Sequence, residues 1–303
     1  MNQALHIHPE VAAALAANQP VVALESTVIT HGLPFPENLE VARGMEAAIR
    51  AKGATPATIA ILDGTIYVGL TSAQLERLAH IPGDEVRKCS RRDLPTVVAQ
   101  GGHGATTVAG TMIIAQLTGI ELFATGGIGG VHRGHPFDVS ADLTELGRTP
   151  VTVVCSGAKS ILDLPATREV LETQGVAVLG YQTDEMPAFF ARSSGLAVDT
   201  RVDSAETVAQ IIAARRALKL QTATLVTVPV PEGMQMEDEQ AEQAAIQAQA
   251  EADAQGIHGA ASTPFLLKRL VELTDGKSLR SNVALLKNNA SVAAEIAVAL
   301  ANK

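Results

Sequence analysis

The stretch Thr125–Lys159 reads TGGIGGVHRGHPFDVSADLTELGRTPVTVVCSGAK and gathers glycines, histidines, aspartates and one lysine. Glycine lets a backbone turn tightly or approach a ligand, because it has no Cβ. Aspartate and histidine can bind cations or carry protons. Lys159 follows the apolar run Val151–Cys155, which predicts a lysine at the end of a buried strand, where desolvation would make its amine nucleophilic. We therefore expect the rest of the chain to be built around this stretch.

The composition indicates a folded protein without a nucleic-acid or membrane surface. Of the 303 residues, 47% are hydrophobic and 18% are charged, enough to bury a large core. The net charge of -9 disfavours a nucleic-acid partner, and the 3% aromatic content without tryptophan disfavours base-stacking platforms and membrane belts. Cys89 and Cys155 show no metal-binding spacing and are interpreted as buried apolar residues in a reducing compartment. With no signal-peptide pattern, we expect a cytoplasmic protein.

Apolar runs of strand length alternate with segments of helical spacing along the chain. Val21–Leu24 and Ile120–Ala124 are predicted strands, and Glu37–Lys52 is a predicted helix closed by a glycine. We also expect a strand at Thr96–Ala99 and a long helix at Gln235–Gln255, the latter partly exposed or packed on a neighbouring subunit. The alternation predicts one domain spanning residues 1–303, an α/β/α sandwich with a mixed, largely parallel central sheet.

The C-terminal region is predicted to contain two helices, Pro264–Leu273 and Ser291–Leu300. Between them, Ser281–Asn282 is expected to precede an apolar turn that leads to Asn288–Asn289.

Three segments outside the opening stretch carry candidate functional groups. Glu25 follows the first predicted strand, a frequent position for active-site residues in α/β proteins. The basic run Val86–Asp93 is either a solvated surface segment or a phosphate clamp, in which Lys88 is the first candidate. The glycine-rich segment Gln100–Thr107 is expected to form a turn into a helix starting at Val108, whose N-terminus would suit a phosphate.

Familiar nucleotide-binding motifs are absent from the sequence. His132 stands where the dinucleotide fingerprint requires its third glycine, and Thr152 stands where a P-loop requires its first. Asp138 and Asp142 are four residues apart and would share a face if they lay on one helical turn, an arrangement that suits Mg²⁺ or Mn²⁺. A helix cap plus a solvated carboxylate would give the same pattern. His132 and His135 could be ligands, proton carriers or ordinary loop residues.

Several blocks, in unbroken order from about Val21 onward, resemble pseudouridine-5′-phosphate glycosidases. The matching blocks read ALEST (23–27), HGLPFP (31–36), KCSRRDLP (88–95), GGHGATTV (101–108), ATGGIGGVHRG (124–134), DVSADL (138–143), CSGAKS (155–160), GYQTDE (180–185) and SNVAL (281–285). The sequence is similar to this family over nearly its whole length, and the number of blocks makes the match specific.

The resemblance implies a homotrimeric enzyme that uses one Mn²⁺ per subunit to cleave pseudouridine 5′-phosphate reversibly into uracil and ribose 5-phosphate. It implies that Lys159 forms an imine at the sugar C1′ and that Glu25 donates a proton. Asp138 matches the metal position of the family. The positions implied to contact substrate are Lys88, Val108, Ser140, Ala141 and Asp142, together with His132 and Asn282.

Other functions remain open from the residues themselves. A two-carboxylate glycosidase would pair Glu25 with an aspartate, but it would leave Lys159 without a role and must expel a poor carbon leaving group. An aldolase-type lyase acting on another sugar phosphate could use the same lysine. A non-catalytic phosphosugar-binding protein could retain the same fold.

Overall fold

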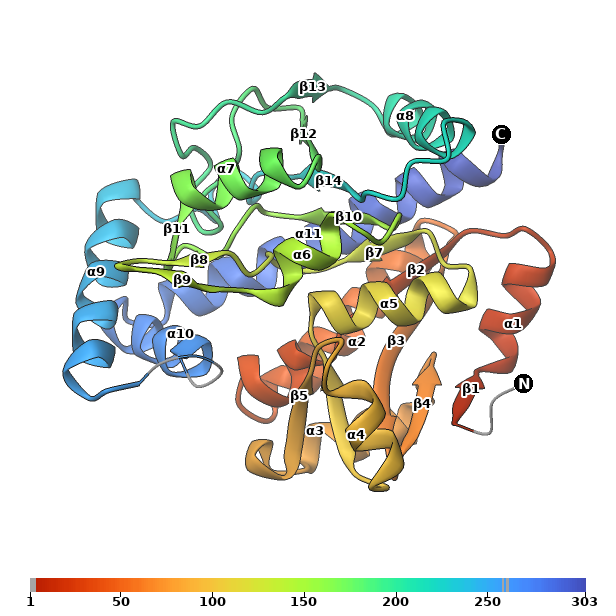
Figure 1. The fold of residues 1–303 in the computed structure, drawn as a ribbon, viewed down its shortest axis with the longest axis horizontal. Helices are drawn as coiled ribbons and strands as arrows, with labels where there is room; N and C mark the ends of the chain where they lie inside the picture. Colours follow the sequence, from red (N-terminus) through yellow and green to blue (C-terminus); the bar gives the residue numbers. More distant parts are fainter. Residues whose placement is uncertain (1–3, 258, 260–261) are drawn as a thin grey trace.

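The computed structural model describes residues 4–257, 259 and 262–303. Figure 1 shows a central sheet with helices on both faces. The strands are β1 (Leu5–Ile7), β2 (Val21–Leu24), β3 (Thr55–Leu62), β4 (Thr65–Val68), β5 (Val86–Cys89), β6 (His103–Thr106), β7 (Leu122–Ala124), β8 (Val131–His132), β9 (His135–Val139), β10 (Thr152–Cys155), β11 (Leu162–Asp163), β12 (Ala177–Tyr181), β13 (Thr200–Val202) and β14 (Thr224–Thr227).

Eleven of these strands form one sheet in the order β1-β4-β3-β2-β7-β10-β14-β12-β13, with β6 pairing with β3 and β5 pairing with β6. The pairings are parallel except where β3 meets β4 and β6. β11, β8 and β9 form a second, small antiparallel sheet. The predicted sandwich with a mixed, largely parallel sheet is therefore confirmed.

The helices cover both faces of the large sheet. They are α1 (Pro9–Ala16), α2 (Glu37–Ala51), α3 (Ser72–His80), α4 (Leu94–Ala99), α5 (Val108–Thr118), α6 (Ala141–Leu146), α7 (Leu164–Thr173), α8 (Ala205–Ala217), α9 (Asp238–Ala254), α10 (Ser262–Leu273) and α11 (Lys277–Ala301). α11 packs against α2, α8 and strands β2, β7 and β10, whereas α5, α6 and α7 lie in a row on the other side (Figure 1). α9 and α10 pack together at one end of the molecule.

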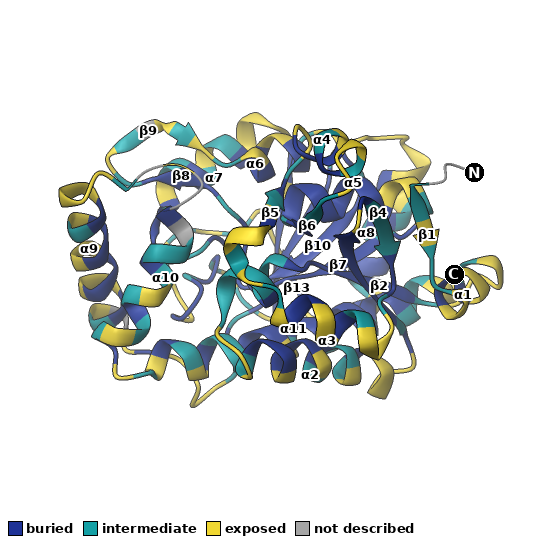
Figure 2. Cartoon of the chain, turned by 90° about the horizontal axis from the view of Figure 1, so that it is seen from below, coloured by how far each residue is buried: buried dark blue, intermediate teal, exposed yellow. Residues whose placement is uncertain are grey.

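The central strands β2, β7, β10 and β14 are buried at every residue, so they read as continuous apolar runs rather than as alternating patterns (Figure 2). Because β2, β7 and β10 are parallel neighbours, their carboxyl ends meet at one edge of the sheet. Glu25, Thr125 and the segment Ser156–Lys159 follow these three ends. The register of the sheet therefore brings the candidate residues of three distant segments to one place.

The predicted strand at Thr96–Ala99 is wrong. This segment belongs to α4, which has Pro95 in its first turn, where a missing N–H costs nothing. The glycine-rich segment before Val108 was predicted to be a turn, but it contains strand β6. Gly104 makes this strand possible, because a Cβ there would lie 2.7 Å from Cys89 Sγ on the neighbouring β5. The helix expected from Val108 is confirmed as α5.

The predicted turn between Ser281 and Asn289 is also wrong, because α11 runs unbroken through it. No glycine or proline interrupts residues 277–301, so nothing in the sequence ends the helix. By length and composition alone α11 could cross a membrane, but it packs against three helices, α2, α8 and α10, and three strands. Its apolar character is explained by that position.

The helix predicted at Gln235–Gln255 is present as α9 with shorter bounds. Its buried residues are Gln249 and a narrow stripe of alanines: Ala241, Ala244, Ala245, Ala248 and Ala252. α9 packs on α10 of the same chain. The two cysteines, Cys89 and Cys155, are buried as expected, and burial raises the pKa of each thiol to about 12.

Candidate functional site

Glu25 lies directly after β2, and only 7% of its surface is exposed. The hydroxyl groups of Thr27 and Thr125 donate hydrogen bonds to its two carboxylate oxygens. Thr125 follows β7, the strand beside β2, so the pair forms because the two strand ends are neighbours. Glu25 is thus held in one orientation at the edge of the sheet.

Lys159 lies beyond the end of β10 and is half-buried. Gly157 makes the turn with φ +81°, and a Cβ there would lie 2.2 Å from the carbonyl oxygen of Pro187. The backbone N–H of Lys159 donates to Ile128 O at 3.2 Å, and the Ile128 N–H donates to Gly157 O at 3.1 Å. The lysine is therefore presented on a loop fixed against the glycine-rich segment. The next element is β11, so Lys159 does not start a helix.

Lys88 lies on β5, and the side chains of the basic run differ in how far they are exposed. Arg87, Arg91 and Arg92 are exposed, whereas Lys88 is half-buried. Burial lowers the pKa of Lys88 to about 8; the charge of Lys159 acts in the same direction, and Asp142 and Glu25 oppose it. Lys88 therefore lies within electrostatic range of three other predicted site residues, and the interpretation of the whole run as a solvated segment fails for this lysine.

Asp142 is buried and joins two backbone segments. Its Oδ1 accepts a hydrogen bond from Ala109 N, and its Oδ2 accepts one from Gly129 N, both at 2.9 Å. A Cβ at Gly129 would lie 2.7 Å from Asp142 Oδ2, so only glycine permits this approach. Asp142 thus ties the first turn of α5 to the glycine-rich loop.

Ser140 is the N-cap of α6, where its hydroxyl accepts from Asp142 N at 3.2 Å. Ala141 is exposed, and Val108 is the buried first residue of α5. Three of the predicted substrate positions, Ser140, Ala141 and Asp142, are therefore consecutive at the start of α6. Another, Val108, precedes Ala109, whose backbone N–H donates to Asp142.

Asp138 and Asp142 do not share a helical face, so that prediction is wrong. Asp138 is on strand β9, and Asp142 is in the first turn of α6. In residues 4–257, 259 and 262–303, no three histidine, cysteine, aspartate or glutamate side chains gather to hold a metal. An ion at Asp138 would therefore take most of its ligands from water, backbone or substrate, as Mg²⁺-like ions commonly do.

His132 is buried on β8, close to both lysines. Burial lowers its pKa; the charge of Asp138 opposes this change, and His135, Lys159 and Lys88 add to it. The imidazole is therefore held neutral at neutral pH and can accept or donate one hydrogen bond. His132 thus belongs to the same cluster as Lys88 and Lys159. His135 instead lies 3.4 Å from Asp253 of α9.

Asn289 was predicted only to follow a turn, and its role was missed. It is fully buried on α11, and its Nδ2 donates to Thr125 O at 2.9 Å and to Ser156 Oγ at 3.1 Å. It therefore fixes the ends of β7 and β10 together. The available signal in the sequence was the spacing of Asn289 three and four residues after Leu286 and Leu285, which puts its amide on the apolar face of a helix. Asn282 lies seven residues earlier on α11, about two turns away, and its side chain makes no hydrogen bond with a described residue.

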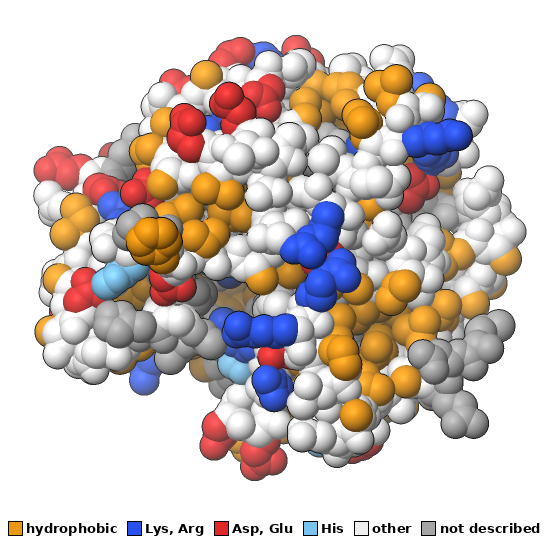
Figure 3. All heavy atoms as spheres, in the orientation of Figure 1, with side chains coloured by type: hydrophobic (Ala, Val, Ile, Leu, Met, Phe, Trp, Pro, Cys, Tyr) orange, Lys and Arg blue, Asp and Glu red, His pale blue; other side chains and the backbone are white. Residues whose placement is uncertain are grey.

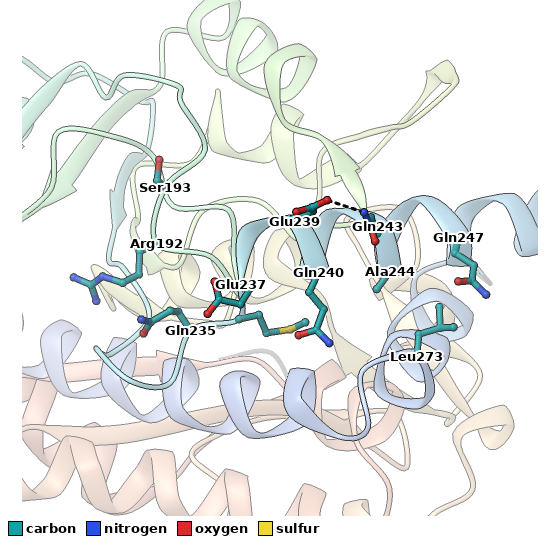
Figure 4. Close-up of a pocket in the computed structure, with 11 residues that line it drawn as sticks. Arg192, Ser193, Gln235, Glu237, Glu239, Gln240, Gln243, Ala244, Gln247 and Leu273 are labelled. Carbon is teal, nitrogen blue, oxygen red and sulfur yellow. Dashed lines mark hydrogen bonds between the residues drawn. The ribbon is translucent and has the colours of Figure 1, made fainter.

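Figure 3 shows lysine and arginine side chains gathered near the middle of one face, beside a recess. A separate groove of about 930 Å³ lies between α9 and the segment around Arg192 (Figure 4). Its walls are mainly glutamine and glutamate, including Gln240 and Gln243, and it contains none of the clustered site residues. This groove is therefore not where the reactive groups meet.

Two lysines, a buried glutamate and a buried aspartate at the carboxyl edge of a largely parallel sheet define an α/β enzyme with its site where such sheets bind ligands. Residues 10–299 match the family described as indigoidine synthase A like protein. The chain is 55% identical over 296 residues to the pseudouridine-5′-phosphate glycosidase of Dinoroseobacter shibae, covering 97% of this chain and 96% of that protein. It is 54% identical to the enzyme of the same name from Symbiobacterium thermophilum, covering 99% of each.

Two solved structures have the same fold. The crystal structure of the prealnumycin C-glycosynthase in complex with ribulose 5-phosphate has a TM-score of 0.91 and 42% identity, covering 100% of this chain and 98% of that one. An indigoidine synthase A-like protein from Thermotoga maritima has a TM-score of 0.89 and 39% identity, covering 98% and 96%. This chain belongs to the pseudouridine-5′-phosphate glycosidase family, and the resemblance found in the sequence is confirmed.

Proposed function

We propose that this protein cleaves the carbon–carbon glycosidic bond of pseudouridine 5′-phosphate reversibly, giving uracil and ribose 5-phosphate through an imine on Lys159. The observation that carries the proposal is that the parallel strands β2, β7 and β10 end at one sheet edge, which places Glu25 and Lys159 within electrostatic range of Lys88. The substrate is taken from the names of relatives that are 54–55% identical over nearly the whole chain.

The bond to be broken joins C1′ of the sugar to C5 of uracil, so protonating a glycosidic heteroatom cannot release the base. In the proposed reaction, the Lys159 amine bonds to C1′ while the C1′–O4′ bond breaks, and Glu25 protonates O4′. The Glu25 carboxylate then takes the proton that the C1′-bound amine loses and passes it to C5 as the C1′–C5 bond breaks, and the nitrogen lone pair forms the C1′=N imine. Water adds to C1′ and releases ribose 5-phosphate and the free lysine. The net reaction consumes one water.

Lys88 and the start of α5 suit the phosphate group. A protonated lysine provides a positive charge, and the first turn of a helix provides backbone N–H groups and the positive end of its dipole. Ala109 N and Gly110 N already donate to Asp142 and Thr107. The N–H of Val108 is therefore the first-turn donor that we assign to substrate.

Asp142, Ser140 and Ala141 would hold the sugar. A carboxylate has about four lone-pair positions, so Asp142 can accept from sugar hydroxyl groups while it keeps its two backbone bonds. His132, neutral because of burial, and Asn282 would complete the pocket around the base. With 3% aromatic residues in the chain, hydrogen bonds would contribute more to base recognition than stacking.

Asp138 is the residue that we propose binds one Mn²⁺ per subunit. Such an ion supplies positive charge that orients the substrate and stabilises developing negative charge. We further propose a homotrimer, as the family resemblance implies, and a cytoplasmic location, as the sequence pattern predicts.

The direct test is an ultraviolet assay of uracil formed from pseudouridine 5′-phosphate. We expect turnover by the wild-type protein and a loss of about 10²- to 10⁴-fold in Glu25→Gln. Glu46→Gln is the matched control: Glu46 accepts a hydrogen bond from Thr58 at 2.6 Å, and burial raises its pKa, so an amide should replace it without loss of activity. Absence of uracil formation by the wild-type protein would refute the substrate, and binding of ribose 5-phosphate without turnover would favour a lyase on another substrate or a binding protein.

A further inference from the structure

The guanidinium group of Arg133 binds two segments that are distant from it in the sequence. Arg133 lies in the turn between β8 and β9, directly after His132. Its Nε donates to Leu162 O at 3.0 Å, and its Nη2 donates to Ser160 O at 3.1 Å. Its two terminal nitrogens also donate to the carboxylate of Glu242 on α9, Nη2 at 2.9 Å. One side chain therefore joins the β8–β9 hairpin, the chain after Lys159 and α9.

The two carbonyl oxygens that Arg133 binds belong to the backbone that directly follows Lys159. On the other side of the lysine, the backbone is held by Ile128 O. Among the described residues, Arg133 is the side chain that hydrogen-bonds to the backbone between 159 and 162. The place of Lys159 relative to the hairpin is thus set by this guanidinium together with the pairing of β11 with β8, in which Leu162 lies opposite His132.

The pair of Arg133 and Glu242 is not primarily a source of stability. The side chains of Arg133 and Glu242 are 24% and 51% exposed, and ion pairs this accessible contribute little net free energy. Arg133 holds the pKa of Glu242 below its usual value, so the carboxylate is charged throughout the neutral range. The pair instead orients the Arg133 side chain. Because the guanidinium is planar and both of its terminal nitrogens bind Glu242, its remaining N–H groups point in fixed directions.

We propose that Arg133 is a positioning residue for the reaction at Lys159, and that Glu242 orients it. Arg133 fixes the lysine loop against the hairpin that carries His132 and Asp138, so that the amine, the imidazole and the metal position keep one arrangement. This inference rests on the proposed function, since Lys159 must reach one carbon atom of the substrate. A displacement of about 1 Å at a reacting group can cost about 10²-fold in rate.

Arg133→Lys tests the proposal, because it keeps the positive charge but cannot bind both carbonyl groups and the carboxylate together. We expect kcat for uracil release to fall by about 10²-fold, with KM changed by less than about threefold. Amide hydrogen exchange should become faster in the peptide 159–163. Glu242→Gln, which keeps an acceptor oxygen but loses the charge, should lower kcat in the same direction by a smaller factor.

Arg77→Lys is the matched control. Arg77 binds both oxygens of Asp63 at 2.7 and 2.9 Å, in an exposed pair between α3 and the β3–β4 turn. We expect wild-type kcat and wild-type exchange at 159–163 in this variant, because the pair contacts His103 of β6 but no residue assigned to the substrate, the metal or the lysine loop.

The proposal is overturned if Arg133→Lys keeps wild-type kcat and wild-type exchange at 159–163. It is also overturned if kcat falls only in proportion to the unfolded fraction measured by thermal denaturation. Failure of the proposed function is a separate result: the wild-type protein would release no uracil. The exchange measurement needs no substrate, so in that case wild-type exchange in Arg133→Lys would still refute the anchoring of the lysine loop, and faster exchange would support it.

Discussion

The carboxylate of Asp142 accepts a hydrogen bond from the backbone N–H of Ala109 at 2.9 Å, across 33 residues of sequence. Its other oxygen accepts from Gly129 N at the same distance. Asp142 therefore stabilises the site in the absence of substrate. It fixes the N-terminus of α5, where Val108 is assigned to the phosphate, beside the glycine-rich loop. Asp142 therefore has a structural role in addition to the contact with the sugar that we propose for it.

Asp142→Asn should destabilise the protein, because one acceptor oxygen becomes an NH₂ group that faces a backbone N–H. We expect a loss of about 1.5–3 kcal/mol in the free energy of unfolding, measured with denaturant, and a higher KM. Asp163→Asn is the control: Asp163 caps α7 by accepting from Ala166 N, and asparagine caps helices as well as aspartate does. Equal losses in the free energy of unfolding of the two variants would show that Asp142 does not link α5 to the glycine-rich loop.

The pKa of Lys88 predicts how activity depends on pH. Burial and the charge of Lys159 lower this pKa to about 8, so Lys88 loses its positive charge as the pH rises through about 8. Phosphate binding needs the charge, and kcat/KM should therefore fall above pH 8, by at most about tenfold per pH unit. Lys88→Arg keeps its charge at all these pH values and should remove this fall. An identical fall in Lys88→Arg would assign the titration to another group.

Asn289 should be needed for stability and for the placement of Glu25. Asn289→Ala leaves the buried carbonyl of Thr125 and the hydroxyl of Ser156 without the amide, and we expect a loss of about 1–3 kcal/mol in the free energy of unfolding. Turnover should also fall, since Thr125 holds Glu25. Asn288→Ala, one residue earlier on α11 and half-buried, should change the free energy of unfolding by about 0.5 kcal/mol or less. Similar losses at both positions would contradict this account.

Metal removal should abolish turnover if Asp138 binds Mn²⁺. We expect a chelator to remove activity, Mn²⁺ to restore it, and Asp138→Asn to require a higher Mn²⁺ concentration for half-maximal rate, because one charged ligand is lost. Asp184→Asn, a change at an exposed aspartate paired with Arg201, is the control and should keep the wild-type Mn²⁺ requirement. Full activity in chelated, metal-free protein would refute this role of Asp138.

Features that depend on continuous apolar runs could be predicted from the sequence. The strands β2, β7 and β10 are buried on both faces, so each appears in the sequence as an uninterrupted apolar run. The positions of Glu25 and Lys159 after strand ends followed from these runs. Thr96–Ala99 shows the limit of this reasoning, because a short apolar run has no period that separates a strand from a helix.

Contacts between distant segments could not be predicted. Asp142 with Ala109, Asn289 with Thr125, and Arg133 with Glu242 each depend on which elements the fold places side by side. The error at Asp138 has the same origin: its four-residue spacing from Asp142 suits a helix, but pairing of β9 with β8 makes the first of the two residues part of a strand.

The imine that we propose between Lys159 and the sugar is tested most directly by reductive trapping. The protein is incubated with ribose 5-phosphate, reduced with borohydride, digested and examined by mass spectrometry, beside Lys52→Ala, which removes a surface lysine paired with Glu295. We predict a reduced sugar adduct on the peptide that contains Lys159, the same adduct in Lys52→Ala, and neither adduct nor turnover in Lys159→Ala. Wild-type turnover by Lys159→Ala, with no adduct on Lys159 in the wild-type protein, would contradict the account.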